Sequence, residues 1–194
     1  MFIRIILSCF LIINLSFAMS KDEIKSEMSN KIDKVLIILK DSKLSNDKKT
    51  EEIVDIMDSL FDYKLMSRLS LGRTWSEIND KQKNDFVKLF TKKLKDSYVD
   101  KLNLYTDELV EILGTEQPKS NRIILKTQLI GKEDKYNIDY KFYEKETNNW
   151  LIYDVNLLGV SIIQTFRQQF AGFLKDKTFK DLMANLATLP NNTK

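Results

Sequence analysis

The sequence contains no histidine, and its 194 residues include a single cysteine, Cys9. The absence of histidine excludes Ser-His-Asp triads, Cys-His pairs and histidine-ligated metal sites. We therefore expect no metal ion, no cofactor and no catalytic residue. The chain has only two prolines and five glycines, which excludes collagen and argues against long flexible linkers.

The sequence also lacks a strong excess of charge. Lysine and arginine number 31 and aspartate and glutamate 28, which gives a net charge of +3. Nucleic-acid-binding domains normally carry a larger basic excess on one face, so we expect no nucleic-acid partner. Lysine runs such as Lys92-Lys93 are typical of solvated helix faces, with docking on acidic partners or lipid head groups as the alternative.

A long apolar run occurs only near the start of the chain. Arg4 precedes apolar residues 5–15, and Ser16-Phe17-Ala18 has the small-x-small pattern of a signal-peptide cleavage site. A membrane anchor is the alternative, but a span needs about 20 apolar residues. We expect cleavage of residues 1–18, which leaves residues 19–194 as one exported domain without cysteine.

The pattern over the rest of the chain predicts helices, then strands, then helices. Apolar residues recur every three or four positions over residues 20–42, after Asn46, a candidate helix cap, and over 62–71 and 80–102. The same spacing follows Ser161, a candidate helix cap, and returns over residues 178–189.

Residues 107–156 instead alternate between apolar and polar positions. We expect strands near 108–116, 121–130, 135–145 and 149–156, separated by turn residues. Short connections predict a four-stranded antiparallel meander. The expected fold class is α+β, with helices packed on one face of the sheet.

The inner faces of these elements are rich in large apolar side chains. Two interpretations remain open, a tightly packed core or a gap between sheet and helices that forms an apolar ligand cavity. Asp154 ends the last strand, and a buried carboxylate needs a partner. We expect a structural ion pair with Arg68 or Arg167, the alternative being a carboxylate pair with Asp139 for acid/base chemistry.

Two blocks of sequence resemble a known family. The first is FDYKLMSRLSLGRTW at residues 61–75, followed by FVKLF at 86–90. The second is WLIYDV at 150–155, followed by GVS at 159–161 and FRQQF at 166–170. Together they resemble the MlaC family, also called toluene-tolerance auxiliary proteins, over roughly residues 21–189. Phe166 is a departure, because the family often has tyrosine there.

The resemblance implies a periplasmic phospholipid carrier with a deep apolar pocket between sheet and helices. Its ligand would be phospholipid rather than a cofactor. Its partners would be an outer-membrane lipoprotein complex and an inner-membrane ABC transporter with an MCE-domain subunit, a system that maintains outer-membrane lipid asymmetry. The positions expected to line the pocket from the helices are Leu65, Leu69, Trp75, Phe86, Phe90, Leu94, Tyr98, Ile163, Phe166 and Phe170. Those expected from the sheet are Val110, Ile112, Ile123, Leu125, Tyr136, Ile138, Tyr140, Phe142 and Ile152.

Two other function classes remain as alternatives. One is an enzyme with an NTF2-like or cystatin-like fold, whose cavity would contain convergent polar groups with perturbed pKa values. The other is a protein-interaction module with a solid core and no lipid. No heptad pattern or long apolar edge suggests self-association, so we expect a monomer.

Overall fold

The computed structural model describes residues 19–102 and 108–188, and the predicted signal peptide at residues 1–18 lies outside this part. The chain order of helices, strands and helices is as expected. The N-terminal elements are α1 (Ile24–Lys40), α2 (Asn46–Asp58), α3 (Tyr63–Leu71), the 3₁₀ turn η1 (Gly72–Ser76) and α4 (Asp80–Leu102). The strands are β1 (Leu109–Lys119), β2 (Arg122–Ile130), β3 (Lys135–Glu146), β4 (Asn149–Leu157) and β5 (Val160–Ser161), followed by α5 (Ile162–Phe173) and α6 (Phe179–Thr188).

Polar side chains fix where several helices begin. Ser45 accepts a hydrogen bond from the Lys48 N–H, so Ser45 rather than Asn46 caps α2. Before α4, the Gln82 N–H donates to the side chain of Asn79, and the Asn79 N–H donates back to that of Gln82. Ser161 caps α5, as the sequence predicted.

The sheet is an antiparallel meander in the order β1-β2-β3-β4-β5. The expectation of four strands is corrected by the short fifth strand β5. Leu158 and Gly159 both have positive φ, and this two-residue turn folds the chain back so that Leu157 pairs with Val160. A turn of this type normally has asparagine or glycine at its first position. Leu158 occupies that position, so the sequence offers no signal for this turn.

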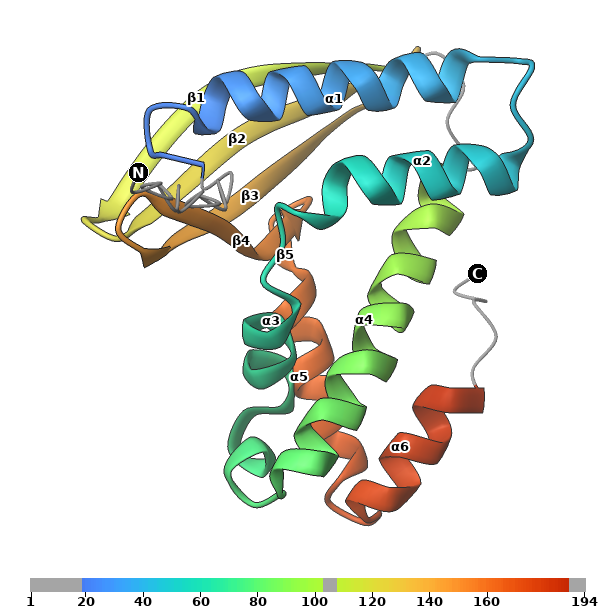
Figure 1. Cartoon of the computed structure of the whole chain (residues 1–194), viewed down its shortest axis with the longest axis vertical. Helices are drawn as coiled ribbons and strands as arrows, with labels where there is room; N and C mark the ends of the chain where they lie inside the picture. Colours follow the sequence, from blue (N-terminus) through green and yellow to red (C-terminus); the bar gives the residue numbers. More distant parts are fainter. Residues whose placement is uncertain (1–18, 103–107, 189–194) are drawn as a thin grey trace, which may run out of the picture.

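The helices form two groups around the sheet (Figure 1). Helix α1 lies across one face of the sheet, with α2 folded back beside it. Helices α3 to α6 pack with one another beyond β4, and α3 and α5 contact that strand. Within the described residues, every helix is too short or too polar to cross a lipid bilayer.

Candidate functional site

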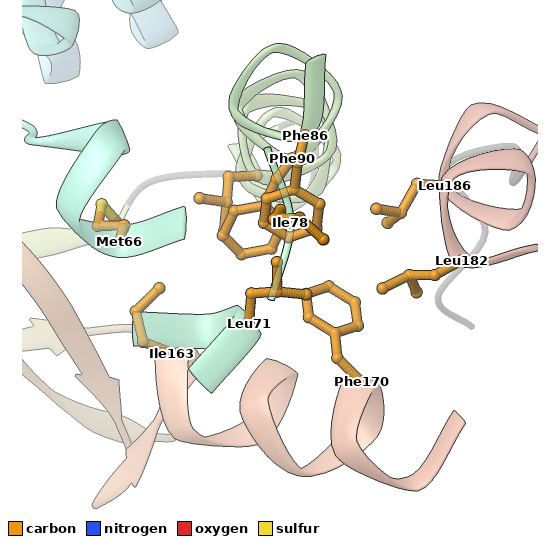
Figure 2. Close-up of a cluster of buried hydrophobic side chains, with 10 residues drawn as sticks. Met66, Leu71, Ile78, Phe86, Phe90, Ile163, Phe170, Leu182 and Leu186 are labelled. Carbon is orange, nitrogen blue, oxygen red and sulfur yellow. The ribbon is translucent and has the colours of Figure 1, made fainter. Parts of the chain in front are cut away.

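The helices α3 to α6 enclose an aromatic cluster, here named the helical core (Figure 2). Phe86 and Phe90 are fully buried and stack at 5.5 Å between ring centroids. Phe170 meets both rings edge-on, and Phe166 meets Phe90 edge-on at 5.0 Å. Such edge-to-face pairs contribute about 0.5–1.5 kcal/mol each beyond burial of their area. The buried members are Met66, Leu71, Ile78, Phe86, Phe90, Leu94, Ile163, Phe170, Leu182 and Leu186.

A second cluster, the sheet core, lies between α1 and the sheet. Ile24, Met28 and Ile32 follow each other at four-residue spacing along α1 and are buried there. Phe142 is the central ring on the strand side, with no exposed surface. The buried members are Ile24, Met28, Ile32, Leu60, Ile123, Leu125, Phe142, Trp150 and Ile152.

The residues expected to line one pocket fall into these two cores. Leu69, Trp75, Phe86, Phe90, Leu94, Ile163, Phe166 and Phe170 belong to the helical core or pack against it. Val110, Ile112, Ile123, Leu125, Tyr140, Phe142 and Ile152 belong to the sheet core or pack against it. Leu65 and Ile138 are half-buried outside both, Tyr136 is exposed, and the Tyr98 side chain lies outside the described part.

The two cores meet at the short segment between α2 and α3. The Ile152 N–H donates to the Leu60 carbonyl at 2.7 Å, and the Asp62 N–H donates to the Ile152 carbonyl at 2.9 Å. Phe61 therefore runs beside β4 like an added strand. Its ring packs against both the helical core and the sheet core. We call residues 60–62 the junction segment.

A buried carboxylate anchors this segment to the sheet. Asp62 accepts hydrogen bonds from the Leu65 N–H at 2.9 Å and from the Tyr143 hydroxyl, and Lys145 Nζ lies 3.4 Å away. Burial raises the pKa of Asp62, but the Tyr143 and Leu65 hydrogen bonds and the Lys145 charge together lower it below its usual value. Burial and the Asp62 hydrogen bond raise the pKa of Tyr143 strongly.

A second buried carboxylate, Asp154, ties β4 to α5. It accepts hydrogen bonds from Lys141 at 2.9 Å, from the Ser161 hydroxyl at 2.7 Å and from the Ile163 N–H at 3.2 Å. The predicted ion pair is therefore present, but the prediction of Arg68 or Arg167 as its partner is wrong. Both arginines are exposed, and within the described residues neither lies within ion-pair distance of Asp154.

A β-bulge explains that error. Phe142 is opposite Ile152 and Lys141 is opposite Asp154, so Tyr153 is an extra residue in β4. Strict alternation would place Asp154 on the face of Ile152, in the sheet core. The bulge instead turns it to the face of Lys141, where the amine and the start of α5 satisfy its charge.

Two hollows open at the surface of the described part of the structure. A groove of about 420 Å³ runs between α2 and α4, and a hollow of about 250 Å³ lies where α1 meets β1. The first is lined by Thr50, Val54, Lys88, Thr91, Lys92, Lys95 and Asp96, and the second includes Ile123 of the expected set. Neither of these hollows in the described part is an apolar pocket between the cores.

The sequence alone did not point to the junction segment. Phe61 and Asp62 begin the first block that resembles the MlaC family, and Asp62 precedes Leu65 by the three residues typical of a helix cap. Tyr143 follows the outward alternation of β3, and nothing in that alternation pairs it with Asp62, 81 residues away.

Comparison with known proteins places this fold. A phospholipid-binding protein from Ralstonia solanacearum, solved in complex with a phospholipid, has a similar structure with a TM-score of 0.71. The two sequences are 21% identical, and the match covers 84% of this chain and 93% of that one. The model of the family described as MlaC protein matches residues 29–188, and the chain therefore belongs to the MlaC family.

Proposed function

We propose that this chain is a phospholipid carrier that holds the acyl chains at the boundary between the helical core and the sheet core. The observation that carries the proposal is the family match over residues 29–188. The similar Ralstonia fold with a bound phospholipid supports it. Phe61, which packs on both cores, marks the boundary where the chains would enter.

The energetics require an enclosed site. Two acyl chains contain about 30 methylenes, and at about 0.8 kcal/mol each their removal from water is worth on the order of 20 kcal/mol before costs. A surface groove leaves most of this area wet. Because both cores are packed in the structure, lipid uptake requires them to move apart, and burial of the acyl chains would offset the cost of separating the two packed faces.

Carriage across the periplasm follows from the same proposal. The carrier would take lipid from an outer-membrane lipoprotein complex and exchange it with an inner-membrane ABC transporter that has an MCE-domain subunit, in either direction. Cleavage at Ala18 would release the domain into the periplasm. Docking at either complex would supply the opening of the boundary.

Binding rather than catalysis is supported by the titratable groups near the boundary. A general acid or base works best with a pKa near the operating pH. The pKa of Asp62 is lowered and that of Tyr143 is raised, so both move away from neutrality. Their mutual hydrogen bond serves to fix the junction segment.

The test is native mass spectrometry of the mature protein purified from periplasm without detergent. A mass excess that matches phospholipid, confirmed by organic extraction, is expected. A bare polypeptide mass that persists after incubation with phospholipid vesicles would contradict the proposal. That outcome would favour the protein-interaction module, the alternative with a solid core and no lipid.

A pair of variants localises the site. Phe61→Asp places a charge where the two cores meet and should reduce the bound lipid at least fivefold. Leu113→Asp is the matched control, because its side chain is 52% exposed on β1. Thermal unfolding verifies that both variants fold, and Phe61→Ala replaces the aspartate variant if that one does not. Equal lipid content in the Phe61 and Leu113 variants would mean that the acyl chains do not bind at the boundary between the two cores.

A further inference from the structure

Helices α1 and α2 are fastened to each other and to the sheet side of the molecule. Lys31 Nζ of α1 donates to the Ile56 carbonyl of α2 at 2.8 Å, and Lys49 Nζ of α2 donates to the Leu39 carbonyl of α1 at 2.7 Å. Hydrogen bonds from a charged amine are about twice as strong as neutral ones. Met57 of α2 packs against the sheet core. The two helices should therefore move together with the sheet core.

Helix α4 belongs to the helical core, and its contact with α2 is open. It packs on α3 and α6, and its side chains Phe86, Phe90 and Leu94 are part of the helical core. The groove of about 420 Å³ lies between α2 and α4, and Figure 1 shows the C-terminal end of α4 next to α2. Among the described residues that line this groove, Val54 is apolar and the others are threonine, lysine or aspartate. We call this contact the α2–α4 seam, and little apolar surface along the groove holds it closed.

An ion pair crosses the seam. Lys95 Nζ of α4 lies 2.6 Å from Asp58 Oδ1, at the end of α2. The Tyr63 hydroxyl at the start of α3 donates to the same carboxylate oxygen at 2.9 Å, and the Lys95 amine lies 5.2 Å from the centre of the Tyr63 ring. We call these three side chains the seam triad. Within residues 19–102 and 108–188, it contains the one ion pair that joins α2 to another helix.

The position of Asp58 indicates that its carboxylate serves this contact rather than its own helix. Asp58 is the last residue of α2, whose last turn contains no basic residue. A carboxylate there faces the negative end of the helix dipole, which disfavours it unless a cation from elsewhere compensates its charge. Asp58 precedes the junction segment by two residues and Tyr63 follows it directly. The seam triad therefore lies on both sides of the segment that pairs with Ile152.

We propose that the seam triad is a latch that holds the α1–α2 pair against the helical core and keeps the boundary between the two cores closed. The latch rests on the proposed function, because lipid uptake would require the cores to separate. Helix α2 moves with the sheet core and α4 with the helical core, so this separation parts Lys95 from Asp58. The two side chains are 25% and 40% exposed, so water in the groove can solvate both charges as they separate. Partly exposed ion pairs are weak, which suits a contact that breaks and re-forms repeatedly.

The experiment measures hydrogen exchange of two amides in the mature protein by NMR. The Asp62 and Ile152 N–H groups pair the junction segment with β4, so their exchange reports opening of the boundary without any lipid. In Lys95→Met, which keeps an unbranched apolar side chain and removes the charge, both amides should exchange about two- to fivefold faster, whereas amides inside the helical core should not change. Lys92→Met is the matched control, because Lys92 lines the same groove but pairs with Asp96 inside α4 at 2.6 Å. It should leave the exchange of both amides unchanged.

A second variant and a lipid measurement complete the test. Asp58→Asn should also accelerate exchange of both amides, and combining it with Lys95→Met should add little, because both substitutions remove the same contact. The Lys95→Met variant, loaded with a fluorescent phosphatidylglycerol, should release it to an excess of vesicles faster than the parent protein by the same factor.

The outcomes separate the latch from lipid carriage. Unchanged exchange at Asp62 and Ile152 in Lys95→Met, or equal acceleration throughout the helical core, would overturn the latch. Unchanged lipid release despite faster exchange would overturn it as well. If the parent protein carries no lipid, lipid carriage alone fails, and the exchange of the two amides still supports or overturns the latch.

Discussion

The helical core and the sheet core bury apolar surface in different ways. In the helical core, phenylalanine rings pack edge to face between four helices. In the sheet core, mainly aliphatic side chains of α1 pack against β2, β3 and β4. Among the described residues, the exposed large apolar side chains all lie on α1, the sheet or the β4–β5 turn. They are Ile37, Leu109, Leu113, Tyr136, Leu157, Leu158 and Val160.

This contrast predicts where the molecule would open if it takes up lipid as proposed. Close-packed interiors have few alternative arrangements, so each core should move as a unit and the boundary should yield first. Polar ties between the two groups of elements include the backbone pairing of residues 60–62 with Ile152 and the contacts of Asp62, Asp154 and Asp58, the last an ion pair with Lys95 of α4. The following substitutions test this division in order of decreasing effect.

The largest effect is expected from removing a central ring of either core. Phe90→Ala should reduce the free energy of unfolding by about 4–5 kcal/mol and Phe142→Ala by about 3–4 kcal/mol. Both side chains are fully buried, but Phe90 also contacts the rings of Phe86, Phe166 and Phe170. Urea unfolding measures both values. A larger loss for Phe142→Ala would show that the aromatic contacts do not distinguish the cores.

A smaller effect is expected at the end of α3. Gly72 has φ +62° and ψ −128°, a region that side chains disfavour, and Arg167 lies against it. Gly72→Ala should therefore destabilise the protein by about 1–3 kcal/mol. Gly172→Ala is the control, because that glycine is in α5 with open space around it, and alanine there should stabilise by about 0.4–1 kcal/mol. Thermal unfolding of both variants suffices, and similar changes would contradict the strain assigned to Gly72.

The bond between the junction segment and the sheet should depend on pH. Tyr143→Phe should cost about 1–3 kcal/mol near neutral pH, since it removes a hydrogen bond to a buried carboxylate. The lowered pKa of Asp62 means that its stabilisation is complete above the unfolded value of about 4 and is lost as pH falls through the folded pKa. The raised pKa of Tyr143 means that its stabilisation is complete below about 10 and is lost at higher pH.

The difference in stability between the parent and Tyr143→Phe should thus be greatest between about pH 5 and 9 and shrink on both sides. Urea midpoints across this range measure it. Tyr153→Phe keeps the ring beside Arg122 and serves as the control. The difference in stability between the parent and this variant should not change near about pH 4. A flat profile for Tyr143→Phe as well would mean that Asp62 does not depend on this hydroxyl.

Local patterns in the sequence predicted the elements well but not how they meet. Four-residue spacing located α1, and alternation located β3, because each reports which side of one element is apolar. The partner of Asp154 depended on a bulge, and the Asp62–Tyr143 bond joins residues distant in the chain. The split of the expected lining residues into two cores likewise depends on long-range packing, which no single stretch of sequence encodes.

The smallest expected effect concerns the turn between β4 and β5. Leu158 has φ +53° and is 58% exposed, so it bears the strain of a left-handed conformation while burying little surface. Leu158→Asn would place Asn-Gly, the favoured pair for such a turn, before β5 and should stabilise the protein by about 0.5–1 kcal/mol. Leu113→Asn, an exposed position on β1, is the control and should give no gain. A gain at Leu158 alone would mean that the sheet side keeps an apolar residue where stability favours a polar one. The helical core has no exposed large apolar side chain among its described residues. A gain at Leu158 would therefore indicate that this leucine is retained for contact with another surface rather than for folding.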